Sequence, residues 1–355
     1  MKALVLALLG FAALTTISGP VRAAESVVWV GKGGLPSITK ALERARPGTT
    51  VKVRAGVYTE NIHFTRSGKP DAPIVLVSAD GPGAAVIRPA DRSQRTVRGF
   101  GVENIVLDGF EVVGSDRDAI TFTQAGADFT RLARNIIIQN NYVHDAGDDG
   151  IKIAQADNVR ILNNIITRTG GQGIDFVAVN DSVIAFNEVS ATPSNSLIMV
   201  KGGSARVAIH DNIVHRSDRA KTTNGILIGG STEKPYFRPG QDTAEAYEVT
   251  AFNNEIYDVE RGIQFMGARD SAAYHNELRA IRGGDVDVSA STVWHDPPLP
   301  SANIYVFENG VSKGGWLNVQ HGQAEGLAVQ GNVVGVPPAG PLGTAETPAD
   351  GRKPG

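Results

Sequence analysis

The sequence predicts an all-β fold in which the chain winds into a parallel β-helix, or β-solenoid, with a capping helix at its N-terminal end. The first observation is a repeat: segments that read NNYV, NNII, FNEV, DNIV, NNEI, HNEL and GNVV carry an asparagine at the same point. These asparagines are Asn141, Asn164, Asn187, Asn212, Asn254, Asn276 and Asn332. The second is their spacing of 23, 23, 25, 42, 22 and 56 residues, about one solenoid turn with insertions in two places.

Each repeat unit carries two short β-rich runs rather than a helix, which excludes helix-pair repeats. Successive coils of a β-solenoid lie about 4.8 Å apart, so equivalent side chains form columns along the axis. Inward asparagines in such a column can bond to one another and also satisfy backbone groups at a tight turn. We therefore interpret the repeated asparagines as structural.

Composition and charge narrow the class of protein. The 355 residues include 41% hydrophobic residues and no cysteine, which suits one elongated domain without disulfides. Residues 1–23 have a basic start at Lys2, an apolar run and Val21-Arg22-Ala23, which predicts a cleaved signal peptide and a periplasmic or secreted protein. The remaining chain is acidic and has no membrane-length apolar run. We expect a monomer with no nucleic-acid partner and no membrane span.

The N-terminal part, residues 24–103, is predicted to form the cap and the first coils. Residues 36–46 (PSITKALERAR) have the periodicity of a short helix, which Pro47-Gly48 ends. The apolar residues of one face of this helix are Ile38, Ala41, Leu42 and Ala45. Such a cap protects the unpaired strand edge at the open end of a solenoid.

Residues 104–335 are predicted to form the regular β-helix, and residues 336–355 a flexible C-terminal tail rich in proline and glycine. In five coils a second strand is expected beyond the repeated asparagine, nine residues on in the regular coils, with starts at Gly150, Gly173, Ser196, Gly225 and Gly262. Two insertions, residues 231–248 and about 283–302, interrupt the repeat. Insertions in solenoids become loops beside a binding face.

Three aspartates are expected to gather on one outer face. Asp148 and Asp149 precede a second strand, and Asp118 aligns with them one coil earlier. Clustered carboxylates either share protons or hold a hard cation such as Ca²⁺. The alternative is that aspartate and glycine only form tight, solvated turns here.

This acidic stretch resembles those of two groups of right-handed β-helix carbohydrate enzymes. In family 9 pectate lyases a DD-G-aromatic-D stretch and an aspartate of the preceding coil bind calcium; Asp148, Asp149 and Asp118 match, and Lys152 stands in place of the last aspartate. The resemblance implies a right-handed parallel β-helix with Ca²⁺ at these carboxylates. Polygalacturonases carry a similar aspartate set, which implies glycoside hydrolysis by the same three residues as an alternative.

A lysine is the candidate base. Lys201 ends a second strand in the segment KGGS, two coils after the aspartates, and family 9 pectate lyases have their base lysine in a similar Lys-x-Gly-Gly setting. The resemblance implies that Lys201 is catalytic. The alternative is a solvated surface lysine.

The first insertion supplies candidate substrate-binding residues. KGGS (201–204), GGST (229–232), PYFRP (235–239) and Glu245-Ala246 together resemble a motif set of secreted β-helix proteins of unassigned activity. We expect Tyr236 to stack on a sugar ring and Arg238 to pair with a substrate carboxylate, with Glu245 also in the binding site. The alternative is a packed loop that only protects the solenoid edge.

Two further residues belong to the predicted binding face. Lys152 and Asp175 occupy equivalent outward positions on adjacent coils, with Gln264 in the same column, so we expect an ion pair between strands. No metal-ligating histidine set, phosphate loop or nucleophile elbow is present in the sequence.

The sequence therefore predicts an exported polysaccharide lyase that cleaves an acidic, uronate-containing glycan by β-elimination. Lys201 would remove the proton next to the carboxylate, and Arg238 or a cation at Asp118, Asp148 and Asp149 would neutralise the developing enolate. Two alternatives remain open: a glycoside hydrolase that uses the three aspartates, and a β-helix that binds carbohydrate without cleaving it.

Overall fold

The computed structural model describes residues 26–190, 196–216, 224–312, 315–320 and 324–335. The predicted signal peptide (1–23) and C-terminal tail (336–355) lie outside the described residues, so export stays a prediction. None of the helices within the described ranges is long and apolar enough to cross a membrane.

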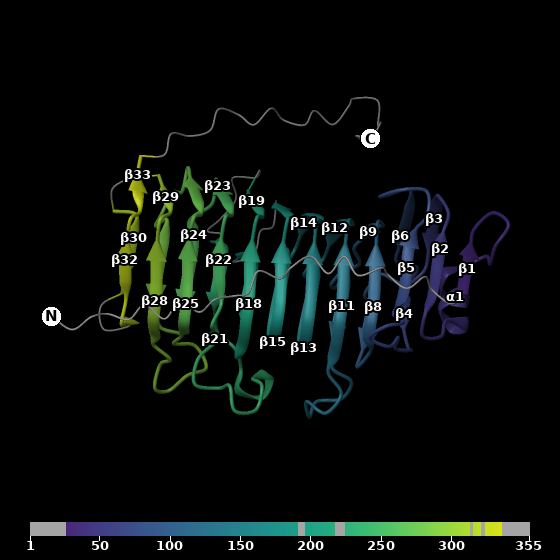
Figure 1. The fold of residues 1–355 in the computed structure, drawn as a ribbon, viewed down its shortest axis with the longest axis horizontal. Coiled ribbons are helices and arrows are strands. Elements are labelled where there is room, and N and C mark those ends of the chain that lie inside the picture. Colours follow the sequence, from purple (N-terminus) through teal and green to yellow (C-terminus); the bar gives the residue numbers. More distant parts are fainter. Residues whose placement is uncertain (1–25, 191–195, 217–223, 313–314, 321–323, 336–355) are drawn as a thin grey trace.

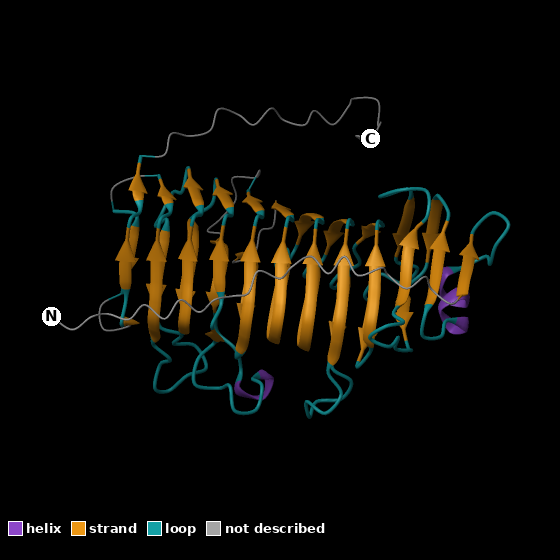
Figure 2. Cartoon of the chain, in the orientation of Figure 1, coloured by secondary structure: helices purple, strands orange, loops and turns teal. Residues whose placement is uncertain are grey.

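The chain forms one long row of stacked coils with three strand positions per coil (Figures 1 and 2). The strands of neighbouring coils pair in parallel, as between β10 (Ile120–Thr123) and β13 (Ile151–Leu162). Each strand position builds one face of the coil, which we call the first, second and third face. The prediction of an all-β parallel solenoid is confirmed.

Three sets of strands make up these faces. Two long strands, β13 and β15 (Ile174–Ala185), run from the first face into the second. The other strands of the first face are β4 (Ile62–Phe64), β7 (Val97–Phe100), β10, β17 (Ser196–Lys201), β20 (Asn224–Gly229), β24 (Arg261–Met266), β27 (Val286–Ser289) and β30 (Leu317–Val319).

The other strands of the second face are β1 (Ser26–Val30), β2 (Thr49–Val53), β5 (Ile74–Ser78), β8 (Glu103–Asp108), β11 (Ala133–Gln139), β18 (Ser204–His210), β21 (Ala246–Tyr247), β22 (Thr250–Phe252), β25 (Ala268–Tyr274), β28 (Ser301–Phe307), β31 (Ala324–Glu325) and β32 (Ala328–Gln330). The third face consists of β3 (Gly56–Thr59), β6 (Ala85–Arg88), β9 (Glu111–Val113), β12 (Tyr142–Ala146), β14 (Ile165–Thr169), β16 (Glu188–Ser190), β19 (Ile213–His215), β23 (Glu255–Tyr257), β26 (Glu277–Arg279), β29 (Gly310–Val311) and β33 (Val333–Val334).

The N-terminal cap is the helix α1 (Ile38–Arg44), which lies at one end of the row (Figure 2). It begins where the hydroxyl oxygen of Ser37 accepts a hydrogen bond from the backbone N–H of Lys40, a common N-cap arrangement. Its apolar face packs onto the first coils, since the predicted inward residues Ile38, Ala41, Leu42 and Ala45 are all buried. The capping helix is confirmed.

The core consists of inward columns of aliphatic side chains. One column on the first face runs through register-paired, fully buried residues: Val97, Ile120, Ile151, Ile174, Ile198, Ile226, Ile263 and Val286. Burying each such side chain contributes about 1.5–3 kcal/mol relative to leaving it exposed. Because inward residues alternate with outward ones, this column fixes which side chains of the same strands face solvent.

The repeated asparagines form a continuous buried ladder. In each step, the side-chain oxygen of one asparagine accepts two hydrogen bonds from the asparagine one coil earlier, one from its side-chain amide and one from its backbone N–H. The Oδ1 atom of Asn212, for example, accepts both bonds from Asn187, each at 3.0 Å. The ladder has an eighth member, Asn309, which lies between Asn276 and Asn332 and bonds to both. The structural role expected for these residues is confirmed, and the 56-residue gap contains one further coil position.

Replacing Asn187 by alanine should lower the free energy of unfolding by about 2–3 kcal/mol, because it leaves the buried N–H of Asn164 unpaired and removes the bond to the carbonyl of Ile161. Urea unfolding followed by circular dichroism measures the change. The exposed Asn318 serves as control, since its replacement by alanine should stay within about 0.5 kcal/mol. Equal effects of the two substitutions would show that the ladder does not stabilise the coil.

Both predicted insertions leave the coil at the same edge. The first lies between β20 and β21 and contains a short 3-10 turn, η1 (Lys234–Tyr236), and the second lies between β27 and β28. Each follows a first-face strand, so both loops project beside the edge where the first face turns into the second (Figure 1). Lys201 lies at this edge.

Candidate active site

Lys201 is the last residue of β17, and a glycine turn follows it directly. Gly202 and Gly203 have φ values of 67° and 75°, in the left-handed region that glycine adopts without steric cost. A Cβ on Gly203 would also lie 2.3 Å from the carbonyl oxygen of Gln241, because the first insertion packs against this turn. The sequence KGGS thus builds a tight edge from which the Lys201 side chain projects outward.

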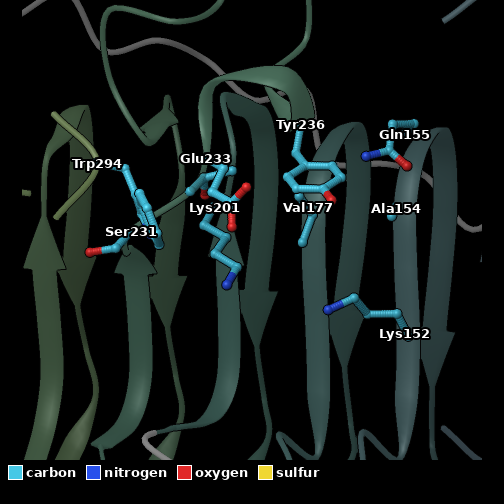
Figure 3. Close-up of a pocket in the computed structure, with 10 residues that line it drawn as sticks. Lys152, Ala154, Gln155, Val177, Lys201, Ser231, Glu233, Tyr236 and Trp294 are labelled. Atoms are coloured by element: carbon cyan, nitrogen blue, oxygen red, sulfur yellow. The ribbon is translucent and has the colours of Figure 1, made fainter. Parts of the chain in front are cut away.

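A hollow of about 350 Å³ opens around Lys201 on the outer surface (Figure 3). Its walls come from β13, β15 and β17 and from the two insertions: Lys152, Ala154, Gln155, Val177, Lys201, Ser231, Thr232, Glu233, Tyr236 and Trp294. Ala154 pairs in register with Val177, and Val177 with Lys201, so small side chains beside the lysine keep this hollow open. The structure therefore brings three of the predicted site residues together: Lys201, Tyr236 and Lys152.

The two lysines of the hollow differ in their electrostatic surroundings. The ammonium group of Lys152 forms ion pairs with Asp149 and Asp175. Lys201, by contrast, forms no ion pair with any residue in the described part of the chain. An amine without a carboxylate partner can approach a ligand without first giving up an interaction.

The expected ion pair between Lys152 and Asp175 is present, and Gln264 lies in the same column. Asp175 lies beneath Lys152 with 1% of its side chain exposed, and its second oxygen, Oδ1, is buried without a hydrogen bond in the described structure. Burial opposes the charged form of Lys152, but the carboxylates of Asp175 and Asp149 outweigh burial and raise the pKa of Lys152. Lys152 is therefore a fixed cation at the edge of the hollow.

The three predicted aspartates do cluster. One oxygen from each of Asp118, Asp148 and Asp149 lies within 4.8 Å of the others. Asp118 accepts hydrogen bonds from Arg95 at 2.7 Å and from Thr121 at 2.8 Å. The carboxylate of Asp149 accepts from the backbone N–H of Gln172 at 2.7 Å and from Lys152 at 3.1 Å. These contacts leave Asp148, which is exposed, as the member of the cluster that solvent can reach most easily.

The crowding of carboxylates shows in their pKa values. Burial, followed by the charge of Asp175, raises the pKa of Asp149 to about 7. Partial burial and the charge of Asp118 also raise the pKa of Asp148. Excess negative charge of this kind is what a bound cation relieves. The donor set, three carboxylates from two adjacent coils, fits a hard divalent cation such as Ca²⁺, although Arg95 and Lys152 already neutralise part of the charge.

Arg238 is not among the residues that line the hollow around Lys201. Its guanidinium group donates to Asp157 at 2.7 Å and to the carbonyl oxygens of Ala156 and Ala178, each at 3.1 Å. Only 16% of its side chain is exposed. In this arrangement Arg238 clamps the first insertion onto β13 and β15, and a substrate carboxylate would have to displace Asp157 to reach it.

Glu245 lies beneath the hollow and is fully buried. Its carboxylate accepts hydrogen bonds from the backbone N–H of Gly202 at 3.1 Å and of Thr232 at 2.8 Å, and from the Thr232 hydroxyl at 2.7 Å. On its other side the ring nitrogen Nε2 of His295 lies 2.8 Å away. Glu245 therefore joins the KGGS turn, the GGST turn and the second insertion.

Comparison with known proteins identifies the architecture. Residues 90–241 match the family model described as the right-handed beta helix region, and none of the curated proteins matches the chain. The fold is a right-handed parallel β-helix. An alginate lyase from Paenibacillus sp. str. FPU-7 is a structural neighbour with a TM-score of 0.63 and 14% identity, over 84% of this chain and 99% of that one.

Two other solved β-helices illustrate the range of activities on this fold. An endo-xylogalacturonan hydrolase from Aspergillus tubingensis has a TM-score of 0.59 and 11% identity, covering 87% of this chain and 92% of its own. The pectate lyase Pel9A has a TM-score of 0.50 and 16% identity, covering 91% and 82%. The expected resemblance to β-helix lyases and, more weakly, to polygalacturonase-like hydrolases is confirmed in the fold. Since lyases and a hydrolase share the fold, the fold does not select the reaction.

Among the polar and aromatic side chains that line the hollow of this β-helix, sequence reasoning did not single out Gln155, Glu233 and Trp294. Gln155 is the last residue of the second-strand segment GIKIAQ (150–155) and has a φ value of 47°, at the bend where β13 passes from the first face to the second. Glu233 and Trp294 belong to the insertions, where no repeat register predicts a position. The composition of the second insertion, with its single tryptophan beside His295, was the available signal.

Asp149 predicts a pH dependence of stability. Its pKa is about 7 in the folded chain against an ordinary value of 3.8, so between these values the folded chain binds more protons than the unfolded chain. The carboxyl therefore lowers the free energy of unfolding as the pH rises from about 4 to about 7. The variant Asp149→Asn lacks this loss and should gain stability relative to the parent over that range, measured by urea unfolding in the presence of EDTA.

Asp128 provides the matched control. Hydrogen bonds from the hydroxyl and the backbone N–H of Thr130 lower the pKa of Asp128, so its contribution to stability is complete once the pH exceeds about 5. The difference between Asp128→Asn and the parent should stay constant between about pH 5 and 7. A difference equally constant for Asp149→Asn would contradict the raised pKa of Asp149.

Proposed function

We propose that this β-helix is an exported polysaccharide lyase that cleaves a uronate-containing glycan by β-elimination, with Lys201 as the base. The observation that carries the proposal is the placement of Lys201. Its amine reaches a solvent-open hollow on the outer face, forms no ion pair with the residues that the structure describes, and shares the hollow with the exposed Tyr236. A glycan that lies across the edge of the coil can reach this amine.

The elimination follows from the chemistry of a uronate. The neutral amine of Lys201 takes the proton from the carbon next to the carboxylate. The electron pair left behind forms a carbon–carbon double bond, the bond to the neighbouring glycosidic oxygen breaks, and that oxygen takes a proton from water. Negative charge builds up on the uronate carboxylate during this step, so a positive group nearby lowers the barrier.

Charge neutralisation has two candidates. A Ca²⁺ ion held by Asp118, Asp148 and Asp149 would bind the uronate carboxylate and stabilise the enolate. Arg238 is the other candidate, provided that substrate displaces Asp157 from its guanidinium group. Lys152 lies between the aspartate cluster and the hollow and supplies fixed positive charge in either case. Tyr236 contributes an exposed ring on which a sugar can stack.

The test is to incubate the purified protein with pectate, alginate and glycosaminoglycans, each with Ca²⁺ or with EDTA. Elimination produces conjugated uronate double bonds, so ultraviolet absorbance should rise with at least one glycan, and a rise lost in EDTA would support the cation. New reducing ends without absorbance would reject elimination in favour of hydrolysis. Glycan binding without either product would reject catalysis altogether.

The raised pKa of Asp149 favours hydrolysis as the second candidate, because a carboxyl that stays protonated near neutral pH can act as a general acid. Against it, 2% of Asp149 is exposed and both of its oxygens already accept hydrogen bonds. Lys201 has neither constraint, so elimination is the preferred proposal.

A further inference from the structure

Trp294 combines two features that are unfavourable for folding. The residue is 64% exposed, although tryptophan has one of the largest apolar side chains to bury. Its φ value is 68°, in the left-handed region where a bulky residue is strained. Neither feature stabilises the fold. A large exposed aromatic ring on a strained backbone indicates a role in contact with a ligand.

The loop holds Trp294 firmly in this position. The loop closes at its base, where the backbone groups of Ser291 and Leu299 bond to each other in both directions at 2.8 and 2.9 Å. The next residue, His295, lies 2.8 Å from the buried carboxylate of Glu245 and makes an edge-to-face contact with the ring of Phe237. The tryptophan ring therefore stands on a rigid support, and no other aromatic ring of the described residues stacks on it.

Trp294 and Tyr236 lie on opposite sides of Lys201. Both rings line the same hollow, and Figure 3 shows the Lys201 side chain between them. Tyr236 comes from the first insertion and is 53% exposed. The two insertions thus each place one exposed aromatic ring beside the candidate base.

We propose that Trp294 is a second sugar-stacking platform, so that sugars of the glycan bind on both sides of the bond that Lys201 cleaves. This inference rests on the proposed function. The C–H face of a sugar ring is apolar and packs on an aromatic face, while its hydroxyls stay in water. A chain held by both rings crosses Lys201 in its interior, so the acidic glycan is cut at internal bonds rather than at an end.

The first experiment measures binding without cleavage. In a Lys201→Ala background, Trp29→Phe and Trp316→Phe leave Trp294 as the only tryptophan of the three in the sequence. Titration with an acidic oligosaccharide, chosen from pectate, alginate and glycosaminoglycan fragments that calorimetry shows to bind, should change the fluorescence of Trp294 in a saturable way. Binding in calorimetry without a change in emission would overturn this inference alone. No binding to any of these glycans would overturn both this inference and the proposed function.

The second experiment separates stacking from folding. With Lys201 intact, Trp294→Ala should raise KM about five- to ten-fold with little change in kcat, whereas Trp294→Phe should retain most of the affinity because it keeps an aromatic face. Thermal unfolding of both variants should match the parent, since the ring is exposed.

Cleavage at internal bonds is tested with the parent enzyme, for which the viscosity of the polymer should fall early in the reaction. An unchanged KM in Trp294→Ala, or release of products only from chain ends, would contradict the proposal.

Discussion

Replacing Lys201 by alanine should lower kcat for elimination by about 10³-fold, because general-base groups typically contribute 10²–10⁴-fold. The loss should appear in the ultraviolet absorbance assay while glycan binding persists, since Tyr236 and Trp294 remain in the hollow. Stability should change little, because Lys201 has no ion pair to lose with the described residues.

Two controls sharpen this test. Lys201→Arg keeps the positive charge but replaces the amine by a guanidinium that does not deprotonate in proteins, so it should be as inactive as the alanine variant. Lys234→Ala removes an exposed lysine of the first insertion that does not line the hollow, and this variant should be fully active. If Lys201→Ala kept more than about a tenth of the parent rate, far above the loss expected for a missing base, Lys201 would not be the base.

The sequence was sufficient to predict the coil because the coil is a periodic object. Inward aliphatic columns and the asparagine ladder repeat at one coil length, so each new turn confirms the register of the previous one. Asn309 was missed although its segment, ENGV, fits the same asparagine pattern; the second insertion had shifted it 33 residues beyond Asn276. Periodicity therefore locates strands well and loses accuracy where an insertion resets the count.

The predicted site residues also differ in how well the repeat locates them, depending on whether they lie on a regular strand or in an insertion. Lys152, Asp175 and Lys201 follow from register, and the structure places them on neighbouring strands of one face. Arg238 and Trp294 belong to insertions, whose conformations depend on contacts far away in sequence. The bond from Arg238 to Asp157 spans 81 residues, and the position of Trp294 depends on His295 reaching Glu245. No local pattern encodes such contacts.

The strongest structural effect is expected at Glu245. Glu245→Ala should lower the free energy of unfolding by about 3–5 kcal/mol, the range found when one partner is removed from a buried charged network. The substitution leaves the buried N–H groups of Gly202 and Thr232 without acceptors and His295 without its carboxylate partner. Urea unfolding followed by circular dichroism measures the loss as a lower midpoint.

Glu245→Gln separates the carboxylate from the space that it fills. Glutamine keeps the volume and one acceptor oxygen, but its NH₂ group must then face a donor, so the loss should be smaller than for alanine and still exceed about 1 kcal/mol. Glu248→Gln, at an exposed position three residues later, should stay within about 0.5 kcal/mol. If Glu245→Gln were as stable as this control, hydrogen bonds to the carboxylate would not hold the two turns together. Interactions other than those of Glu245 would then have to hold in place the edge that carries Lys201, Tyr236 and Trp294.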